Sequence, residues 1–470
     1  MLDTLGALIH ALDRWIWGAP MILLLMGSHV FLTVRTGFIQ RKTAAAIRLS
    51  VARDPEAPGD VSPFGALATA LASTIGTGNI VGVGTAIALG GPGAVLWCWL
   101  TGVLGMATQY AESLLAVRYR VQSADGRLLG GAMYVLDHRL HWKRAARAFA
   151  LFTVLAAFGA GCGVQVSAIA AVLRDGWHIA PASVGVLVST AVALVIFGGV
   201  GAIARVCQRL VPLMALAYMG GCAALLAVNR QWVWPALCWM AREAFTPGAA
   251  AGGLLGGGIL AAARAGVARG LFSNEAGMGS AAIVAAAARC RNPVRQALVA
   301  STATFWDTVV MCLVTGVVLV SGLLADPTLA AADGGGLTAG VFAQLPAAGP
   351  LILTGGMVLF AFSTILGWSY FGERGAEYLW GTRALKPYRA ALCVCALVSA
   401  LVRMDTAWAL ADVLNALMAL PNLAAVLALH KEVAAETHRW LAHLDERDLR
   451  RPPRLDPGET AAAKRTAQAP

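Results

Sequence analysis

The sequence predicts an all-α, polytopic membrane protein with about eleven transmembrane helices, and three observations support this fold class. Hydrophobic residues make up 58% of the 470-residue chain and charged residues only 13%, a balance that favours a helical membrane protein over a soluble domain. The apolar segments reach the roughly 20 residues that a helix needs to cross a bilayer. The 52 glycines suit helices that pack closely within a membrane.

The apolar segments follow one another along the chain. A leading helix is expected at 18–36, and ten core helices follow it. The fourth and fifth core helices are separated only by a short basic link from Arg205 to Arg209. The segment from about Lys431 is polar and rich in arginine, which favours partial disorder. The core helices are expected at 64–88, 93–117, 149–172, 183–203, 210–228, 252–288, 296–322, 348–371, 389–403 and 406–429.

The lysines and arginines indicate the orientation, because cytoplasmic loops of membrane proteins are enriched in both. With the N-terminus outside and the C-terminus cytoplasmic, most of the 36 basic residues fall in cytoplasmic segments. Anionic lipid of the cytoplasmic (inner) membrane attracts such loops, which accounts for the net charge of +11. The chain lacks a soluble basic domain, so no nucleic-acid partner is expected, and no obligate protein partner is evident.

In this orientation the first and sixth core helices run in opposite directions, which predicts two inverted five-helix repeats. The expected organisation is an N-terminal helix with a basic cytoplasmic loop, a first repeat, a second inverted repeat and a polar cytoplasmic tail. The corresponding residues are 1–58, 59–230, 231–430 and 431–470.

Enzymatic and metal-site motifs are not evident in the sequence. The nine cysteines are scattered without a C-x-x-C pair, and no H-E-x-x-H occurs. Buried cysteines that behave as small hydrophobic residues are the simpler interpretation. The loops expected outside carry no cluster of His, Asp or Lys, so an integral-membrane enzyme is a remote alternative. No cofactor is expected.

Two core helices are interrupted by glycine and small polar residues near the expected bilayer midplane. Backbone groups in lipid must be satisfied, so an unwound segment at that depth is tolerated only where it lines a cavity or binds something. Paired interruptions at corresponding positions in two halves indicate the binding site of a secondary transporter. The interruptions read Gly76-Thr77-Gly78-Asn79 and Phe272-Ser273-Asn274-Glu275-Ala276-Gly277-Met278-Gly279-Ser280.

The ends of broken helices favour a particular kind of ligand. A half-helix N-terminus presents free N–H groups to a carboxylate, and a C-terminus presents carbonyls to an ammonium group or Na⁺. Two such ends that face each other match a zwitterion, which favours an α-amino acid over a sugar or a lone anion. The alternative is that the glycines only allow close helix packing.

A set of motifs in this order resembles the alanine/glycine:cation symporter family over about residues 15–430. The resemblance implies the inverted-repeat fold of the neurotransmitter:sodium symporters and Na⁺-coupled uptake of small neutral amino acids by alternating access. Na⁺ would be the coupling ion. The motifs are Gly76-Thr77-Gly78-Asn79-Ile80, Gly105-Met106-Ala107-Thr108-Gln109-Tyr110-Ala111-Glu112, the segment from Gly266 to Ser280, Leu359 to Trp368, Ala411-Asp412 and Leu417 to Asn422.

Three segments depart from the family pattern. Cys162, Gly163 and Ser167 stand on core helix 3, where the family commonly has G-N-M-V-Q-x-N. Ala132 replaces a usual proline, and Ala281-Ala282 stands where Ala-Pro is usual. The first departure alters groups expected near the pocket. It therefore leaves the choice between alanine, glycine and other small amino acids open.

The expected substrate site is built around the two breaks. Thr77, Gly78 and Asn79 are assigned to the amino-acid head group, although the Asn79 side chain could instead cap its own half-helix. Phe272 and Met278 would close over a methyl-sized side chain. Three further residues are included in the site. They are Ser273 beside the break, Gly277 for its free backbone and Gln165, which could contact substrate or another helix.

The resemblance also implies a Na⁺ site. In the implied fold, core helix 8 supplies two adjacent hydroxyls to an ion held against the first break. Here those hydroxyls belong to Ser363 and Thr364, and the partners by position are the carbonyls of Ala72, Ile75 and Phe360. Both hydroxyls could instead bond back to the preceding turn.

Other polar residues in the apolar segments have open roles. Trp368 could form the pocket wall or an inner gate, and Glu275 could be functional or cap the half-helix that follows it. Asp307 could serve a second cation or pair with Arg269, whereas Glu112 would pair with a local base such as Arg118 or cap a polar network. The last two candidates, both possible gate residues, are Asp412 and Asn415.

The sequence therefore predicts a Na⁺-coupled symporter for alanine or glycine. A proton-coupled transporter, or one for larger amino acids, is the main alternative within the same fold. Glu275 and Asp307 keep proton coupling open, whereas Ser363 and Thr364 favour Na⁺.

Overall fold

The computed structural model describes residues 11–12, 15–52, 57–123, 125–246, 258–402 and 404–441. Most of these residues are helical, with one short two-stranded hairpin. The α-helices are α2 (Ala19–Arg35), α3 (Thr43–Ser50), α4 (Pro63–Thr74), α5 (Val83–Gly90), α6 (Gly93–Arg118), α7 (Ala132–Tyr134), α8 (Lys143–Phe158), α9 (Val164–Trp177), α10 (Pro181–Ile196), α11 (Gly199–Val228), α12 (Arg230–Glu243), α13 (Gly258–Asn274), α14 (Ser280–Ala286), α15 (Pro293–Thr304), α16 (Leu313–Ala325), α17 (Gly334–Ala343), α18 (Ala348–Trp380), α19 (Leu385–Ser399), α20 (Met404–Ala428) and α21 (His430–Leu441).

Wider or tighter turns extend several of these helices. The π-helical turns are η2 (Gly78–Gly82), η3 (Val135–Arg139), η4 (Gly159–Gly163) and η5 (Phe305–Cys312). The 3₁₀ turns are η1 (Ile39–Lys42), η6 (Pro327–Ala331) and η7 (Thr382–Ala384). Because η2, η4 and η5 all lie within predicted core helices, the wide turns mark places where regular helix geometry is disturbed.

Five helices in the described part of the chain are long and apolar enough to cross a membrane, or up to seven spans if each bent pair is one span. This composition fits the predicted multi-pass helical protein. The total of eleven and the inverted repeat stay predictions. The five are Lys143–Trp177, Gly199–Val228, Pro293–Ala325, Ala348–Trp380 and Trp408–Ala428.

The predicted break between core helices 4 and 5 is misplaced. The link from Arg205 to Arg209 lies inside the continuous helix α11, and the chain turns earlier, at Phe197 and Gly198. Gly199 follows with φ +71°, a conformation that glycine adopts readily. The two arginines are four residues apart and both exposed, so their charges share one face of the helix without interrupting it.

Five α-helices of the described residues form in segments expected as loops or tail. α3, α7, α12 and α17 are short helices between the longer ones, and α21 forms the first part of the segment for which partial disorder is predicted. α21 folds because one face is covered: Val433, Ala434 and Thr437 are buried. Residues 442–470 and the first part of the predicted sixth core helix, 252–257, lie outside the described residues.

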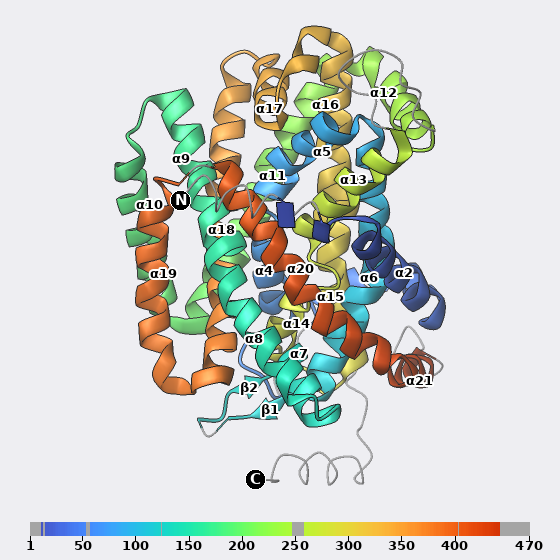
Figure 1. Cartoon of the computed structure of the whole chain (residues 1–470), viewed down its shortest axis with the longest axis vertical. Helices are drawn as coiled ribbons and strands as arrows, with labels where there is room; N and C mark the ends of the chain where they lie inside the picture. The colour runs from blue at the N-terminus through green and yellow to red at the C-terminus, as the bar shows by residue number, and fades with distance from the viewer. Residues whose placement is uncertain are drawn as a thin grey trace.

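The bundle has two distinct ends. α12 and α17 lie at one end, which we call the α12 end, and β1 (Val121–Gln122) with β2 (Leu128–Leu129) lies at the other, the hairpin end (Figure 1). The strands are antiparallel, with Val121 opposite Leu129. α10 and α19 pack together along one side of the bundle, whereas α4, α13 and α14 are surrounded by α6, α15 and α18. The two interrupted helices are therefore central.

Candidate substrate and cation site

The first predicted interruption is present in the structure. α4 begins after Ser62, whose hydroxyl accepts the Gly65 amide, and ends at Thr74. The chain then extends at Ile75 and re-enters helix at Gly78, so that the two halves are bent by 53°. A Cβ at Gly76 would lie 2.5 Å from the Thr364 hydroxyl, which explains why the break passes through glycine.

The second predicted interruption is also present. α13 ends at Asn274 and α14 begins at Ser280, with positive φ at Glu275 (56°), Gly277 (99°) and Gly279 (74°). The Asn274 side-chain oxygen accepts the Ala276 amide at 2.9 Å and satisfies one backbone group of the unwound segment. Residues with a Cβ rarely adopt the positive φ of these two glycines, which explains why the sequence Gly-Met-Gly suits this turn.

A small cavity lies between the two breaks. Both broken helices contribute to its wall, together with η4, α9, α18 and α20. Its lining is polar at several points, which suits a small ligand with charged groups. The lining residues are Ser73, Thr74, Gly76, Gly78, Ala160, Gln165, Phe272, Glu275, Thr364, Trp368 and Asn415.

Of the predicted substrate residues, Gly78, Gln165, Phe272 and Trp368 line this cavity. Thr77, Asn79, Ser273, Gly277 and Met278 do not. Met278 is fully buried, and the Gly277 carbonyl accepts a hydrogen bond from the Asn422 amide at 2.8 Å. The lining residues absent from the predicted site are Ser73, Thr74, Gly76, Ala160, Glu275 and Asn415; Thr364 was predicted as a Na⁺ ligand.

The five oxygens of the predicted Na⁺ site are brought together beside the cavity. The Ser363 hydroxyl lies 3.3 Å from the Ala72 carbonyl oxygen, and the Thr364 hydroxyl lies 3.4 Å from the Ile75 carbonyl oxygen. Both hydroxyls also donate to the Phe360 carbonyl, at 2.9 Å and 3.0 Å. The back-bonding expected as the alternative is thus present, and the same hydroxyls face the first break.

Asp307 connects the two interruptions. Its carboxylate accepts hydrogen bonds from the Asn79 amide at 2.7 Å and from the Ser273 hydroxyl at 2.8 Å. The Asn79 side-chain oxygen in turn accepts the Gly76 amide at 2.9 Å, which lies in the unwound segment, so this bond does not cap the half-helix that begins at Gly78. Asp307 sits in η5, fully buried, and holds both breaks to one another.

The predicted option of pairing Asp307 with Arg269 is wrong, because Arg269 forms an ion pair with Asp412. The Arg269 guanidinium also lies over the rings of Trp408, at 4.8 Å, and Phe272, at 5.5 Å. The two rings contact each other with centroids 4.3 Å apart. Phe272 lines the cavity, so this cluster covers one side of it with an aromatic layer backed by an ion pair.

A further carboxylate, that of Glu112, contacts the second interruption from α6. It accepts the Gly279 amide at 3.1 Å and the Asn422 amide at 2.7 Å. The predicted pairing of Glu112 with Arg118 is therefore wrong; Arg118 pairs with Glu436 in α21. Glu112 lies more than one helical turn before the end of α6, which places it beside the break and away from the loop.

Glu275 lies within the second interruption and is 2% exposed. One carboxylate oxygen accepts the Trp368 indole N–H at 2.8 Å, and the other accepts the Ser280 hydroxyl. These contacts join the break to α18 and to the first residue of α14. Glu275 thus contacts Ser280 at the start of α14 and also lines the cavity.

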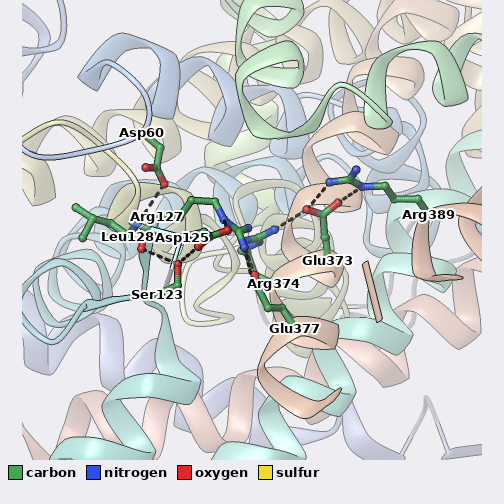
Figure 2. A network of polar contacts seen from close by, with 9 residues as sticks. All are labelled: Asp60, Ser123, Asp125, Arg127, Leu128, Glu373, Arg374, Glu377 and Arg389. Atoms are coloured by element: carbon green, nitrogen blue, oxygen red, sulfur yellow. Dashed lines mark hydrogen bonds and ion pairs between the residues drawn. The ribbon is translucent and has the colours of Figure 1, made fainter. Parts of the chain in front are cut away.

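A cluster of ion pairs lies at the hairpin end of the bundle (Figure 2). Glu373 and Arg374 of α18 are both buried, and Arg374 pairs with Glu373 and with Glu377. Arg389 binds Glu373 at 2.6 Å, and Arg127 of the hairpin binds Glu377 at 2.7 Å. The cluster ties α18 and α19 to the hairpin.

The same hairpin reaches the segment before α4. The Leu128 amide donates to the Asp60 carboxylate at 3.2 Å. Partial burial raises the pKa of Asp60 above its ordinary value, although Arg127 and Arg374 oppose that rise. A continuous set of contacts therefore joins the start of the first broken helix to α18.

The chain is similar to known proteins over nearly its whole length. The sequence profile of the sodium:alanine symporter family matches residues 2–452. The chain therefore belongs to the sodium:alanine symporter family. The chain is therefore a transporter, as the sequence predicted. The family is named for the symport of sodium and alanine.

Individual relatives span nearly the whole chain. The sodium/alanine symporter AgcS of Methanococcus maripaludis is 44% identical over 440 residues, with 92% of this chain and 96% of the relative covered. An uncharacterized transporter of Haemophilus influenzae is 45% identical over 446 residues, with 94% and 97% covered.

Solved structures resemble the fold. The crystal structure of MhsT in complex with L-phenylalanine matches with a TM-score of 0.57 and 15% identity, covering 81% of this chain and 92% of that chain. A Na⁺-coupled sialic acid symporter in a substrate-bound outward-open state matches with a TM-score of 0.51 and 11% identity, covering 90% and 86%. At these identities the likeness concerns the fold.

Proposed function

We propose that this protein couples the entry of Na⁺ to the uptake of alanine or glycine by alternating access. It would lie in the cytoplasmic membrane with its N-terminus outside, its C-terminus cytoplasmic and two inverted five-helix repeats. The main support is the approach of the Ser363 and Thr364 hydroxyls to the carbonyls of Ala72 and Ile75, beside the cavity that Thr364 lines. Membership of the family and the likeness to AgcS, a sodium/alanine symporter by name, add to it.

The proposed coupling follows from this position. Na⁺ bound between α18 and the first break would fix the unwound segment, and Thr364 would place the ion directly beside the substrate cavity. Each ligand would then tighten the binding of the other by the same factor, because coupling between two binding sites is reciprocal. The head group would meet the backbone of Gly76 and Gly78, and the apolar side of the cavity at Phe272 would limit the side chain to about a methyl group.

A transport assay tests the proposal. Purified protein in liposomes should take up radiolabelled alanine when a Na⁺ gradient points inward, and an ionophore that collapses a proton gradient at constant membrane potential should leave uptake intact. Competition with each amino acid would rank alanine, glycine and larger residues. Uptake that follows the pH gradient and ignores Na⁺ would refute Na⁺ coupling and favour the proton-coupled alternative.

A further inference from the structure

Glu275 presents a carboxylate to the cavity, and within the described part of the chain its hydrogen-bond partners are neutral. They are the Trp368 indole and the Ser280 hydroxyl. The residue is 2% exposed and lies in a helix break that is central in the bundle. A buried carboxylate that lacks a compensating positive charge is costly, and in a membrane such a group marks a functional site.

The surroundings increase this negative potential. Asp307 and Glu112, both buried carboxylates, approach the same two breaks and are bonded to neutral donors as well. The nearby cation Arg269 is paired with Asp412 on the other side of Phe272. The electrostatic field in the cavity therefore favours a positively charged ligand group.

We infer that Glu275 binds the ammonium group of the substrate and thereby makes a free amino group a requirement for transport. The inference rests on the proposed function, because it assigns a role within the same substrate cavity. Glu275 lines the cavity together with Gly78, the first residue of the half-helix after the first break, where a helix N-terminus favours a carboxylate. The two charged ends of an α-amino acid would then meet complementary groups on the two broken helices.

Trp368 acts as the positioning residue for this contact. Its indole N–H holds one Glu275 oxygen at 2.8 Å, which fixes the carboxylate at the cavity wall and leaves acceptor capacity on both oxygens. The Ser280 hydroxyl restrains the other oxygen from the start of α14. A carboxylate held from two sides loses little conformational entropy when it binds an ammonium group.

The test compares alanine with L-lactate, which keeps the carboxylate and methyl group and replaces the ammonium group by a hydroxyl. Binding of each is measured on purified protein in saturating Na⁺ by competition with radiolabelled alanine. Wild type should prefer alanine strongly. In Glu275→Gln, alanine affinity should fall by about 10- to 150-fold, as expected for loss of a hydrogen bond between charged groups, and the preference over L-lactate should shrink by a similar factor.

Two variants serve as controls. Glu112→Gln removes a carboxylate that approaches the same break but does not line the cavity, so its alanine-to-lactate preference should fall much less than that of Glu275→Gln. Glu275→Asp keeps the charge but withdraws it by one methylene, so alanine affinity should fall while the preference for an ammonium group persists. The preference is a ratio of two affinities and does not depend on the yield of folded protein.

The outcomes separate this inference from the proposed function. If wild type binds alanine in a Na⁺-dependent manner but Glu275→Gln keeps the wild-type preference, the ammonium assignment is overturned and the function stands. An equal loss of preference in Glu112→Gln would likewise overturn it, because the effect would then be general electrostatics. If wild type shows no Na⁺-dependent alanine binding, the proposed function itself fails.

Discussion

Removal of the hydroxyls of Ser363 and Thr364 should raise the Na⁺ concentration needed for half-maximal uptake. The two hydroxyls lie 3.3 Å and 3.4 Å from the carbonyl oxygens of Ala72 and Ile75, and together with the Phe360 carbonyl they supply the five oxygens of the proposed site. In Ser363→Ala or Thr364→Ala the ion loses one oxygen. The carbonyls remain, so the site is weakened and not abolished.

The size of the effect follows from the contact that is lost. A hydrogen bond or ligand to a charged group contributes about 1.5–3 kcal/mol, which corresponds to roughly a 10- to 150-fold rise in the half-maximal Na⁺ concentration for each variant. The double variant should rise further than either single one. Thr364→Ser keeps the hydroxyl and should remain close to wild type.

The assay is radiolabelled alanine uptake in liposomes over a series of Na⁺ concentrations, normalised to the amount of inserted protein. Ser369→Ala is the matched control, because the Ser369 hydroxyl lies in the same helix and bonds to the Leu366 carbonyl of its own helix at 2.6 Å. It should keep the wild-type Na⁺ dependence. An unchanged Na⁺ dependence in the double variant would show that the hydroxyls only bond back to their own helix, and the site would be refuted.

Three further predictions concern the cavity wall, the cluster of ion pairs and α21. Phe272→Ala should admit larger neutral amino acids in competition assays, whereas Met278→Ala, outside the lining, should keep the wild-type size limit; the reverse result would place Met278 in the pocket. Arg374→Ala removes the shared partner of two buried glutamates, although Arg389 still pairs with Glu373 and Arg127 with Glu377. It should therefore lower the free energy of unfolding, but by less than the ~3–5 kcal/mol of a buried charge that is left without any partner. The measurement is the melting temperature in detergent, and a change no larger than in exposed Arg383→Ala would contradict the prediction. Burial opposes ionisation of Glu432, but hydrogen bonds from Tyr119 and Arg139 hold its pKa below the usual 4.5, so α21 docking should be fully stable above about pH 4.5 and weaken as the pH falls through the lowered pKa. Spin-label distances between α21 and the hairpin that stay constant to pH 3 would contradict this.

The sequence predicted the site best where glycine or polar residues interrupt an otherwise apolar helix. Glycine beside small polar residues in the middle of an apolar segment disfavours a regular helix, and both interruptions are found at the predicted positions. The adjacent hydroxyls of Ser363 and Thr364 were placed correctly against the first break, through the family resemblance. Ser73 and Thr74 carry a similar signal, because they are polar and directly precede that break, but the predicted substrate site did not include them.

Sequence reasoning was weaker for residues whose role depends on a partner from another helix. Asn79 and Ser273 face Asp307 of η5 and not the cavity, and Glu112 faces Asn422 of α20. The periodicity of a helix gives the face on which a residue lies, but it does not give the neighbour that covers that face. Arg269 illustrates this, because the amino-acid sequence gives no reason to expect an ion pair with Asp412 and not with Asp307.

The sequence by itself determined the helical membrane class and the two broken helices, whereas the family resemblance indicated the hydroxyl pair opposite one of them. Hydropathy and the need to satisfy backbone groups in lipid act along the chain, so they can be read from it directly. The tertiary structure alone decided that α11 is continuous, that α21 is covered by the bundle and that Glu275 faces the cavity beside Trp368. These features depend on contacts between segments far apart in the chain, and their free energy arises only when the helices pack.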